Sequence, residues 1–175
     1  GTSTAQAISD VSRTGTEAAA LIALGYHETA FARYVLQGFC EQGPAGARCD
    51  GGRARGPWQV WSWCRGAWDG PDGTERAVRE GARCAVGLLR TARVRCQAQG
   101  WAGMFSGYRA LSNCTWPGGH RRVKLGDAIA FAAKQNMPIA ESRLAAVLGT
   151  SAERMELVPL ACEVLREMIR RSEEH

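Results

Sequence analysis

The sequence predicts a mainly α-helical fold that is interrupted by one long irregular segment. Apolar residues recur at helical spacing in residues 14–38, 74–96 and 101–108. Between the first two stretches, residues 38–73 are rich in Gly, Pro, Trp and Cys and follow no helical period. Segments of this kind usually carry function, and a short hairpin or helical turns are expected within 58–68.

Length and composition are those of an ordinary globular protein. The 175 residues are 45% apolar and 22% charged, which suits one domain with a buried core, with or without an appendage. No apolar run reaches the roughly 20 residues that span a bilayer, so no membrane span is expected. The sequence begins at Gly1 without a signal-peptide pattern, and we expect a mature or trimmed form.

The net charge of +5 comes from arginines that are scattered along the predicted helices rather than gathered in one tract. A solvated basic face explains this distribution better than a nucleic-acid site, so no nucleic acid is expected as a partner. An acidic polymer such as a bacterial cell wall would also suit this charge.

Seven cysteines are a high count for this length, and they predict disulfides. No Cys-x-x-Cys pair is present and only three histidines accompany them, so no metal site is expected. Disulfides favour an extracellular or periplasmic protein, with an intracellular protein holding reduced thiols as the alternative. A phage-associated protein also stays open. Cys40 and Cys49 bracket one loop and are a candidate pair, whereas Cys162 is expected outside the disulfides.

The first two helices carry terminal signals. Thr14 and Glu17 form a capping-box pattern, and Gly38 is expected to end the first helix. Thr74 caps the second helix, and its internal glycines at 81 and 87 indicate close packing against another element. Its inward face is expected to hold Ala77, Gly81, Ala85 and Leu88.

One acidic residue interrupts the apolar face of the first helix. Leu21, Leu24, Phe31 and Val35 recur at the spacing of one face, and Glu28 takes the position between Leu24 and Phe31. A carboxyl group among apolar side chains favours its protonated form, and a protonated carboxylic acid is what general acid catalysis requires. The structural alternative is a carboxylate at the edge of the stripe that reaches water or pairs with an arginine.

The last third of the sequence changes character. Beyond Val123 tryptophan vanishes and glycine becomes sparse, and three more helices are expected between 125 and 171. We therefore divide the chain into a domain at 1–123 and a helical C-terminal extension at 124–175. The alternative is that these helices complete the same domain.

Three short motifs follow one another in order. They are His27-Glu28-Thr29 on the first helix, Gly56-Pro57-Trp58-Gln59 after a glycine-rich loop, and Phe105-Ser106-Gly107-Tyr108 following a helix. This order resembles the lysozyme-like superfamily, specifically the soluble lytic transglycosylases and goose-type lysozymes. The resemblance covers roughly residues 15–120. It implies a lysozyme-like domain that cleaves the β-1,4 bond between N-acetylmuramic acid and N-acetylglucosamine in peptidoglycan.

The resemblance also implies roles for single residues. Glu28 would be the general acid that protonates the glycosidic oxygen, Gln59 would line the sugar cleft, and Tyr108 would orient the acid. Trp58 and Trp61 could stack on sugar rings, with filling of the core as the alternative. No cofactor and no metal is implied, and a monomer that acts on peptidoglycan glycan strands is expected.

A second carboxylate would decide the reaction. Asp50 precedes the second motif in the loop where goose-type lysozymes carry a water-positioning aspartate, so it is the candidate base of a hydrolase. The alternative is an Asp-Gly-Gly turn without a catalytic role. Lytic transglycosylases lack this base and let the substrate close an internal 1,6-anhydro ring.

The sequence departs from the family pattern at several positions, which keeps other functions open. Pro57-Trp58 replaces Leu-Met in the second motif, Arg109 replaces the asparagine of the third, and Thr29 replaces serine. The main hypothesis is a peptidoglycan-cleaving enzyme, either a lytic transglycosylase or a muramidase. The alternative is a non-catalytic peptidoglycan-binding or assembly module on the same scaffold, and a nucleic-acid binder is the third hypothesis.

Overall fold

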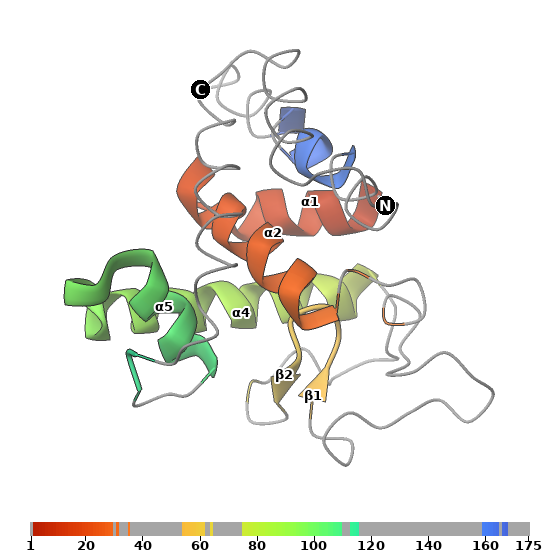
Figure 1. Cartoon of the computed structure of the whole chain (residues 1–175). Coiled ribbons are helices and arrows are strands. Elements are labelled where there is room, and N and C mark those ends of the chain that lie inside the picture. Colours follow the sequence, from red (N-terminus) through yellow and green to blue (C-terminus); the bar gives the residue numbers. More distant parts are fainter. Residues whose placement is uncertain are drawn as a thin grey trace.

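The protein is mainly helical, as the sequence predicts, in a computed structural model of the chain (Figure 1). Its helices surround one hydrophobic core, and a short β-hairpin lies at one end of it. The structure describes residues 2–29, 31, 35, 54–61, 64, 75–109, 113–115, 159–164, 166 and 167.

The central element is the helix α2, which spans Gly15–Thr29. Every residue from Ala18 to Gly25 is buried, so this part of the helix is enclosed on all sides. The sequence predicts an amphipathic helix with one apolar stripe, and that prediction is wrong for this part. Alanine is the reason, because four alanines among these eight residues allow neighbours to approach every face closely.

The start of α2 is capped as the sequence predicts. The hydroxyl oxygen of Thr14 accepts a hydrogen bond from the backbone N–H of Glu17 at 3.2 Å. The carboxylate of Glu17 accepts a hydrogen bond from the backbone N–H of Arg13 at 2.8 Å. The end comes earlier than the predicted Gly38, since α2 ends at Thr29.

An N-terminal helix, α1, spans Thr2–Val11 and was not expected from the sequence. Ala5, Ala7 and Ile8 are buried in the common core. The hydroxyl of Ser12 donates to the carbonyl oxygen of Ile8 at 2.6 Å, which satisfies one of the carbonyls at the end of the helix.

The longest helix, α4, spans Glu75–Arg95 and agrees with the helix predicted after Thr74. It packs against α1, α2, β2 and the later helix α5 (Gly100–Arg109). Its inward face is rotated from the predicted one: Gly81 and Ala85 are buried, whereas Ala77 and Leu88 are only partly buried. The remaining buried residues are Val78, Ala82, Cys84, Val86, Leu89 and Ala92.

The 3-10 turn η2 (Gln97–Gln99) connects α4 to α5 in the sequence. The two helices also pack tightly against each other. A Cβ atom on Gly107 would lie 3.0 Å from the Cβ of Ala92, so the small residue allows the two helices to approach closely. A disulfide between Cys96 and Cys114, with their Cα atoms 5.4 Å apart, ties the start of this turn to the chain beyond α5.

A two-stranded antiparallel hairpin consists of β1 (Ala54–Arg55) and β2 (Val60–Trp61). It confirms the short hairpin expected in the irregular segment, although the hairpin begins four residues before the expected 58. A disulfide joins Cys64, just after β2, to Cys84 on α4. The hairpin is therefore anchored to the longest helix.

The described part of the C-terminal extension is helical at 159–164 and packs into the same core as α1 (Figure 1). A hydrogen bond of 3.4 Å links the side chains of Gln6 and Glu167. The predicted boundary at 123/124 lies outside the described residues, so the division into two domains stays a prediction. Cys162 is buried here and belongs to neither of the two disulfides above.

The disulfides predicted from the cysteine count are confirmed by these two bridges. The candidate pair Cys40 and Cys49 lies outside the described residues. Among the helices that the structure describes, none is long and apolar enough to cross a membrane.

An ion pair connects the ends of three helices. Arg90 on α4 donates from Nε and Nη2 to the two carboxylate oxygens of Glu17, at 2.8 and 2.7 Å, and from Nη2 to the carbonyl oxygen of Val11 at 3.0 Å. The hydrogen bonds from Arg90 lower the pKa of Glu17 below its ordinary value of 4.5, and partial burial opposes them. The pair therefore holds the junction of α1 and α2 against α4.

Replacing either of two glycines tests the packing of α2 and α4, and the two replacements are expected to change the stability in opposite directions. A Cβ on Gly87 meets nothing within 4 Å, whereas a Cβ on Gly25 would overlap the ring of Phe31. We expect Gly87→Ala to raise the free energy of unfolding by about 0.5–1 kcal/mol and Gly25→Ala to lower it by about 2 kcal/mol. Urea unfolding measures both, and a neutral Gly25→Ala variant would contradict the placement of Phe31.

Because of the ion pair of Glu17, we expect part of the free energy of unfolding to be lost at acidic pH. Because the pKa of Glu17 is lowered in the folded state, its contribution is complete above 4.5 and is lost as the pH falls through the folded value. We expect Glu17→Gln to be less stable at pH 7 and to converge on the parent protein between about pH 5 and pH 2. Thermal unfolding across this range measures it, and a constant difference at every pH would refute the coupling.

Candidate functional site

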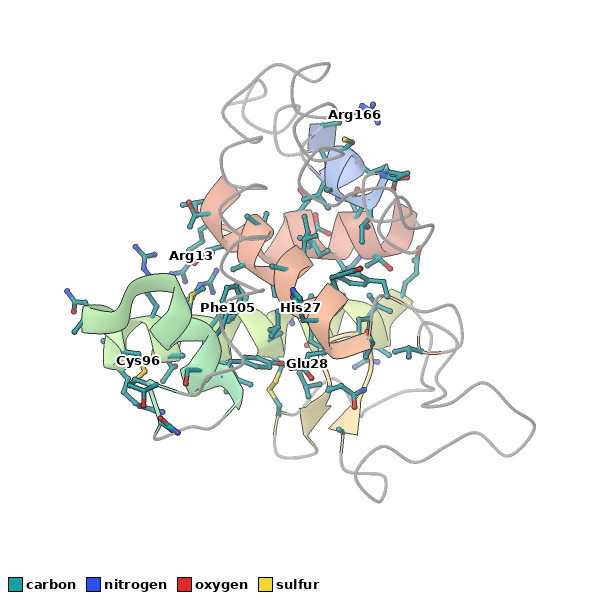
Figure 2. All side chains as sticks on the ribbon, viewed as in Figure 1. Arg13, His27, Glu28, Cys96, Phe105 and Arg166 are labelled. Carbon is teal, nitrogen blue, oxygen red and sulfur yellow. A yellow bond between two sulfur atoms is a disulfide. The ribbon has the colours of Figure 1, made fainter. Side chains whose placement is uncertain are left out.

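Glu28 lies in the last turn of α2, at the end that faces the hairpin (Figure 2). The residues before it, up to Gly25, are buried, and those from Tyr26 to Thr29 are partly exposed. Glu28 is thus half-buried where the central helix leaves the core. The sequence predicts Glu28 within an apolar stripe along the helix. In the structure Glu28 instead follows the enclosed part of α2 and lies in its partly exposed last turn.

The turn of the hairpin, Gly56 to Gln59, carries the second predicted motif. The carbonyl oxygen of Gly56 accepts hydrogen bonds from both the backbone N–H and the side-chain Nε2 of Gln59, each at 3.0 Å. Gly56 has a φ of 73° and Gln59 a φ of 51°, so the turn uses the left-handed region at both of its ends. Pro57 at the second position suits such a turn, because its ring fixes φ in advance.

The end of α2 is attached to this turn through Thr29. Its hydroxyl oxygen lies 2.9 Å from the carbonyl oxygen of Pro57 and 3.2 Å from that of Gly25. With one proton to donate, the hydroxyl bonds most closely to Pro57. The residue after Glu28 therefore fixes the distance between the helix end and the hairpin.

Trp58 is fully buried, with an exposed fraction of 0%. Its indole N–H donates to the carbonyl oxygen of Leu21 on α2 at 2.9 Å, and its ring faces Gly81 on α4. The predicted role of Trp58 in stacking on a sugar is wrong for this structure, because no face of the ring reaches solvent. The alternative of filling the core describes the residue.

Phe31 completes the apolar packing around the turn. It has a φ of 50°, which a bulky side chain rarely adopts and which prevents α2 from continuing. Its ring lies over Gly25 and meets the ring of Trp58 edge to face, with the ring centroids 5.9 Å apart. This packing explains why the backbone strain at Phe31 is tolerated.

Tyr108, the last residue of the third predicted motif, reaches the same place from α5. Its phenolic O–H donates to the carbonyl oxygen of Trp58 at 2.6 Å. Burial raises the pKa of Tyr108 above its ordinary value, and the negative charge of Glu28 raises it further. The phenol therefore stays protonated across the physiological range, and Glu28 lies close enough to act on it.

In the structure, the elements that carry three of the six predicted site residues meet. Glu28, Gln59 and Tyr108 lie on α2, the hairpin turn and α5, which meet around the backbone of Trp58. The side chain of Trp61 in β2 is not among the described ones. Asp50 lies outside the described residues, so its role as a base stays a prediction.

The arrangement combines one carboxyl group with one buried phenol. Glu28 supplies the carboxyl group at the boundary of the core, and its charge acts on the phenol of Tyr108. The phenol donates a hydrogen bond to the carbonyl oxygen of Trp58 and so links α5 to the hairpin turn. Among the described residues, no group of three or more His, Cys, Asp or Glu is placed to hold a metal ion.

Comparison of the chain with protein-family models, with curated proteins and with solved structures finds no match in any of the three. The likeness to lysozyme-like enzymes therefore depends on the three motifs alone.

Sequence reasoning missed the contacts that hold these motifs together. The acceptor of the Trp58 indole is a main-chain carbonyl of α2, 37 residues away in the sequence, and no side-chain pattern marks it. A polar ring in a buried position usually needs a partner, and this is the only signal that the sequence offered.

The buried role of Trp58 predicts a specific effect of Trp58→Phe. The variant loses the hydrogen bond to Leu21 and part of the ring volume, so we expect the free energy of unfolding to fall by about 2 kcal/mol. Urea unfolding measures this loss, and unchanged stability would contradict the buried role of Trp58.

Proposed function

We propose that this protein is a peptidoglycan-cleaving glycosidase with Glu28 as its general acid. The observation that carries the proposal is the meeting of three motifs that are far apart in the sequence. Thr29 bonds to Pro57, Tyr108 bonds to Trp58, and the charge of Glu28 acts on Tyr108. The same three motifs, in the same order, are those that resemble soluble lytic transglycosylases and goose-type lysozymes.

In the proposed reaction the acid form of Glu28 protonates the glycosidic oxygen as the bond to the anomeric carbon breaks. The leaving sugar departs with a free hydroxyl, and Glu28 becomes a carboxylate. Tyr108 and Thr29 act as positioning residues, because their hydrogen bonds to Trp58 and Pro57 hold the hairpin against α5 and against the end of α2.

The second half of the reaction has two possible forms. In a transglycosylase, the 6-hydroxyl of N-acetylmuramic acid attacks the anomeric carbon and gives its proton to the Glu28 carboxylate, which forms a 1,6-anhydro ring. In a hydrolase, Asp50 takes a proton from the attacking water. A transglycosylase needs no second carboxylate, and Glu28 is the carboxylate that the described contacts bring to the hairpin.

The disulfides support an oxidising location for this activity. Cys64–Cys84 and Cys96–Cys114 both brace elements that carry the site, namely the hairpin and α5. Small secreted proteins use such bridges where the environment keeps them oxidised. A secreted or periplasmic enzyme that meets the cell wall agrees with this pattern and with the net charge of +5.

Glu28→Gln is the decisive variant for this proposal. The amide keeps the shape of the side chain but cannot donate the required proton, so release of soluble muropeptides from purified peptidoglycan should fall at least about 100-fold. The matched control is Glu75→Gln, an exposed glutamate in the first turn of α4, which should retain full activity.

Mass analysis of the products distinguishes the remaining functions. Products 18 Da lighter than reducing sugars (one water, by their formulae) would identify a transglycosylase, and reducing ends would identify a hydrolase. If the parent protein pelleted with peptidoglycan but released nothing, the non-catalytic binding module would replace the enzyme. Full activity of the folded Glu28→Gln variant would refute the role of Glu28.

A further inference from the structure

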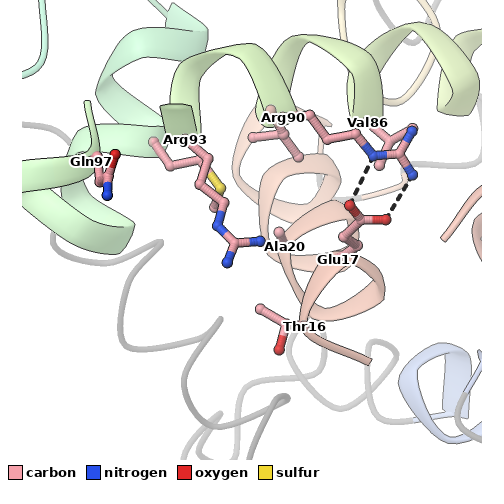
Figure 3. A pocket seen from close by; sticks show the side chains of 9 residues that line it. Thr16, Glu17, Ala20, Val86, Arg90, Arg93 and Gln97 are labelled. Carbon is pink, nitrogen blue, oxygen red and sulfur yellow. Dashed lines mark hydrogen bonds and ion pairs between the residues drawn. The ribbon is translucent and has the colours of Figure 1, made fainter. Parts of the chain in front are cut away.

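A pocket of about 310 Å³ lies at the opposite end of α2 from Glu28 (Figure 3). Thr16, Glu17 and Ala20 line it from α2, and residues of α4, η2 and α5 complete it. Thr16 and Glu28 are twelve residues apart on one helix, which corresponds to about 18 Å at 1.5 Å per residue. The pocket is therefore separate from the site of the proposed reaction.

The floor of the pocket is apolar. Ala20, Val86, Leu89 and Met104 contribute to its wall, and all four belong to the hydrophobic core. This volume lies at the lower end of the range for small-molecule pockets, so a ligand with a short apolar part would fit it.

The charges at the pocket favour an anion. The carboxylate of Glu17 is already neutralised by its two hydrogen bonds from Arg90. Arg93 adds a positive charge, and Figure 3 shows its guanidinium group extending toward Ala20 and Thr16. Arg13 also acts on the charge of Glu17. The pocket lining thus holds two arginines and one glutamate, and its surplus charge is positive.

Further polar groups at this pocket suit the same kind of ligand. Thr16 lies in the first turn of α2, where the positive end of the helix dipole favours negative charge. The amide of Gln97 from η2 lies at the rim beside Arg93. A guanidinium group, a hydroxyl and an amide are the groups that bind a carboxylate.

We propose that this pocket binds a small carboxylic acid, with the carboxylate against Arg93 and Thr16 and a short apolar part on the floor. Two sources share this chemistry, namely a free short-chain acid and the carboxyl end of a peptide whose last residues are small and apolar. The inference does not depend on the proposed function, because it concerns the other end of α2.

Binding can be tested with octanoate and with acetyl-alanyl-alanine, using the full chain labelled at its methionine and alanine methyl groups. We expect the NMR signals of Met104 and Ala20 to shift with saturable binding, and the probe with the lower Kd identifies the source. Octanamide, which lacks the charge, should bind at least about tenfold more weakly than octanoate.

Arg93→Gln is the matching variant, because Arg93 is exposed and its loss should leave the fold intact. We expect it to weaken binding of the better probe about tenfold or more. Arg95→Gln, which removes an exposed arginine of the same helix that does not line the pocket, should bind as the parent protein does. Absence of saturable shifts with both probes, or equal binding by Arg93→Gln, would overturn the proposal.

Discussion

The burial of the Trp58 ring is the contact on which the geometry around Glu28 depends. A tryptophan ring removes roughly 200 Å² from water, which stabilises the fold by about 5 kcal/mol at the usual coefficient. Its indole N–H is bonded to Leu21, so this apolar gain is not offset by an unpaired polar group. Because the ring lies between α2 and α4, it fixes the position of the hairpin turn relative to the core. A ring on the surface would leave the turn free to move relative to Glu28.

The fixed position of the Trp58 ring determines which hydrogen bonds the neighbouring residues make. With the ring fixed, the carbonyl oxygens of Pro57 and Trp58 become fixed acceptors, and Thr29 and Tyr108 each donate to one of them. Helices α2 and α5 are thereby attached to the same short turn from different sides. The disulfide between Cys64 and Cys84 limits how far the chain after β2 can leave α4. Preorganisation of this kind is what a catalytic acid requires, because its proton must meet the substrate in one geometry.

The sequence was a good guide where one local signal decides the structure. The cap at Thr14, the helix of Glu75–Arg95 and the presence of disulfides depend on neighbouring residues or on composition, and all three are found. The sequence was a poor guide where small residues determine how a helix packs. Alanine carries little periodic signal, so neither helix α1 nor the enclosed part of α2 was predicted. The three motifs of the candidate site could be named in advance, but the hydrogen bonds that join them end on main-chain carbonyls, which no residue pattern marks.

The enclosure of α2 also explains why the polar chemistry of the described residues lies at its two ends. A charged side chain between Ala18 and Gly25 would have no access to water and would cost several kcal/mol without a partner. Glu17 stands just before this stretch, where Arg90 compensates its charge, and Glu28 stands after it in the partly exposed last turn, where its charge acts on the buried phenol of Tyr108. The two glutamates therefore differ in environment although they belong to one helix. Glu17 stabilises the fold through this ion pair, which ties the start of α2 to α4.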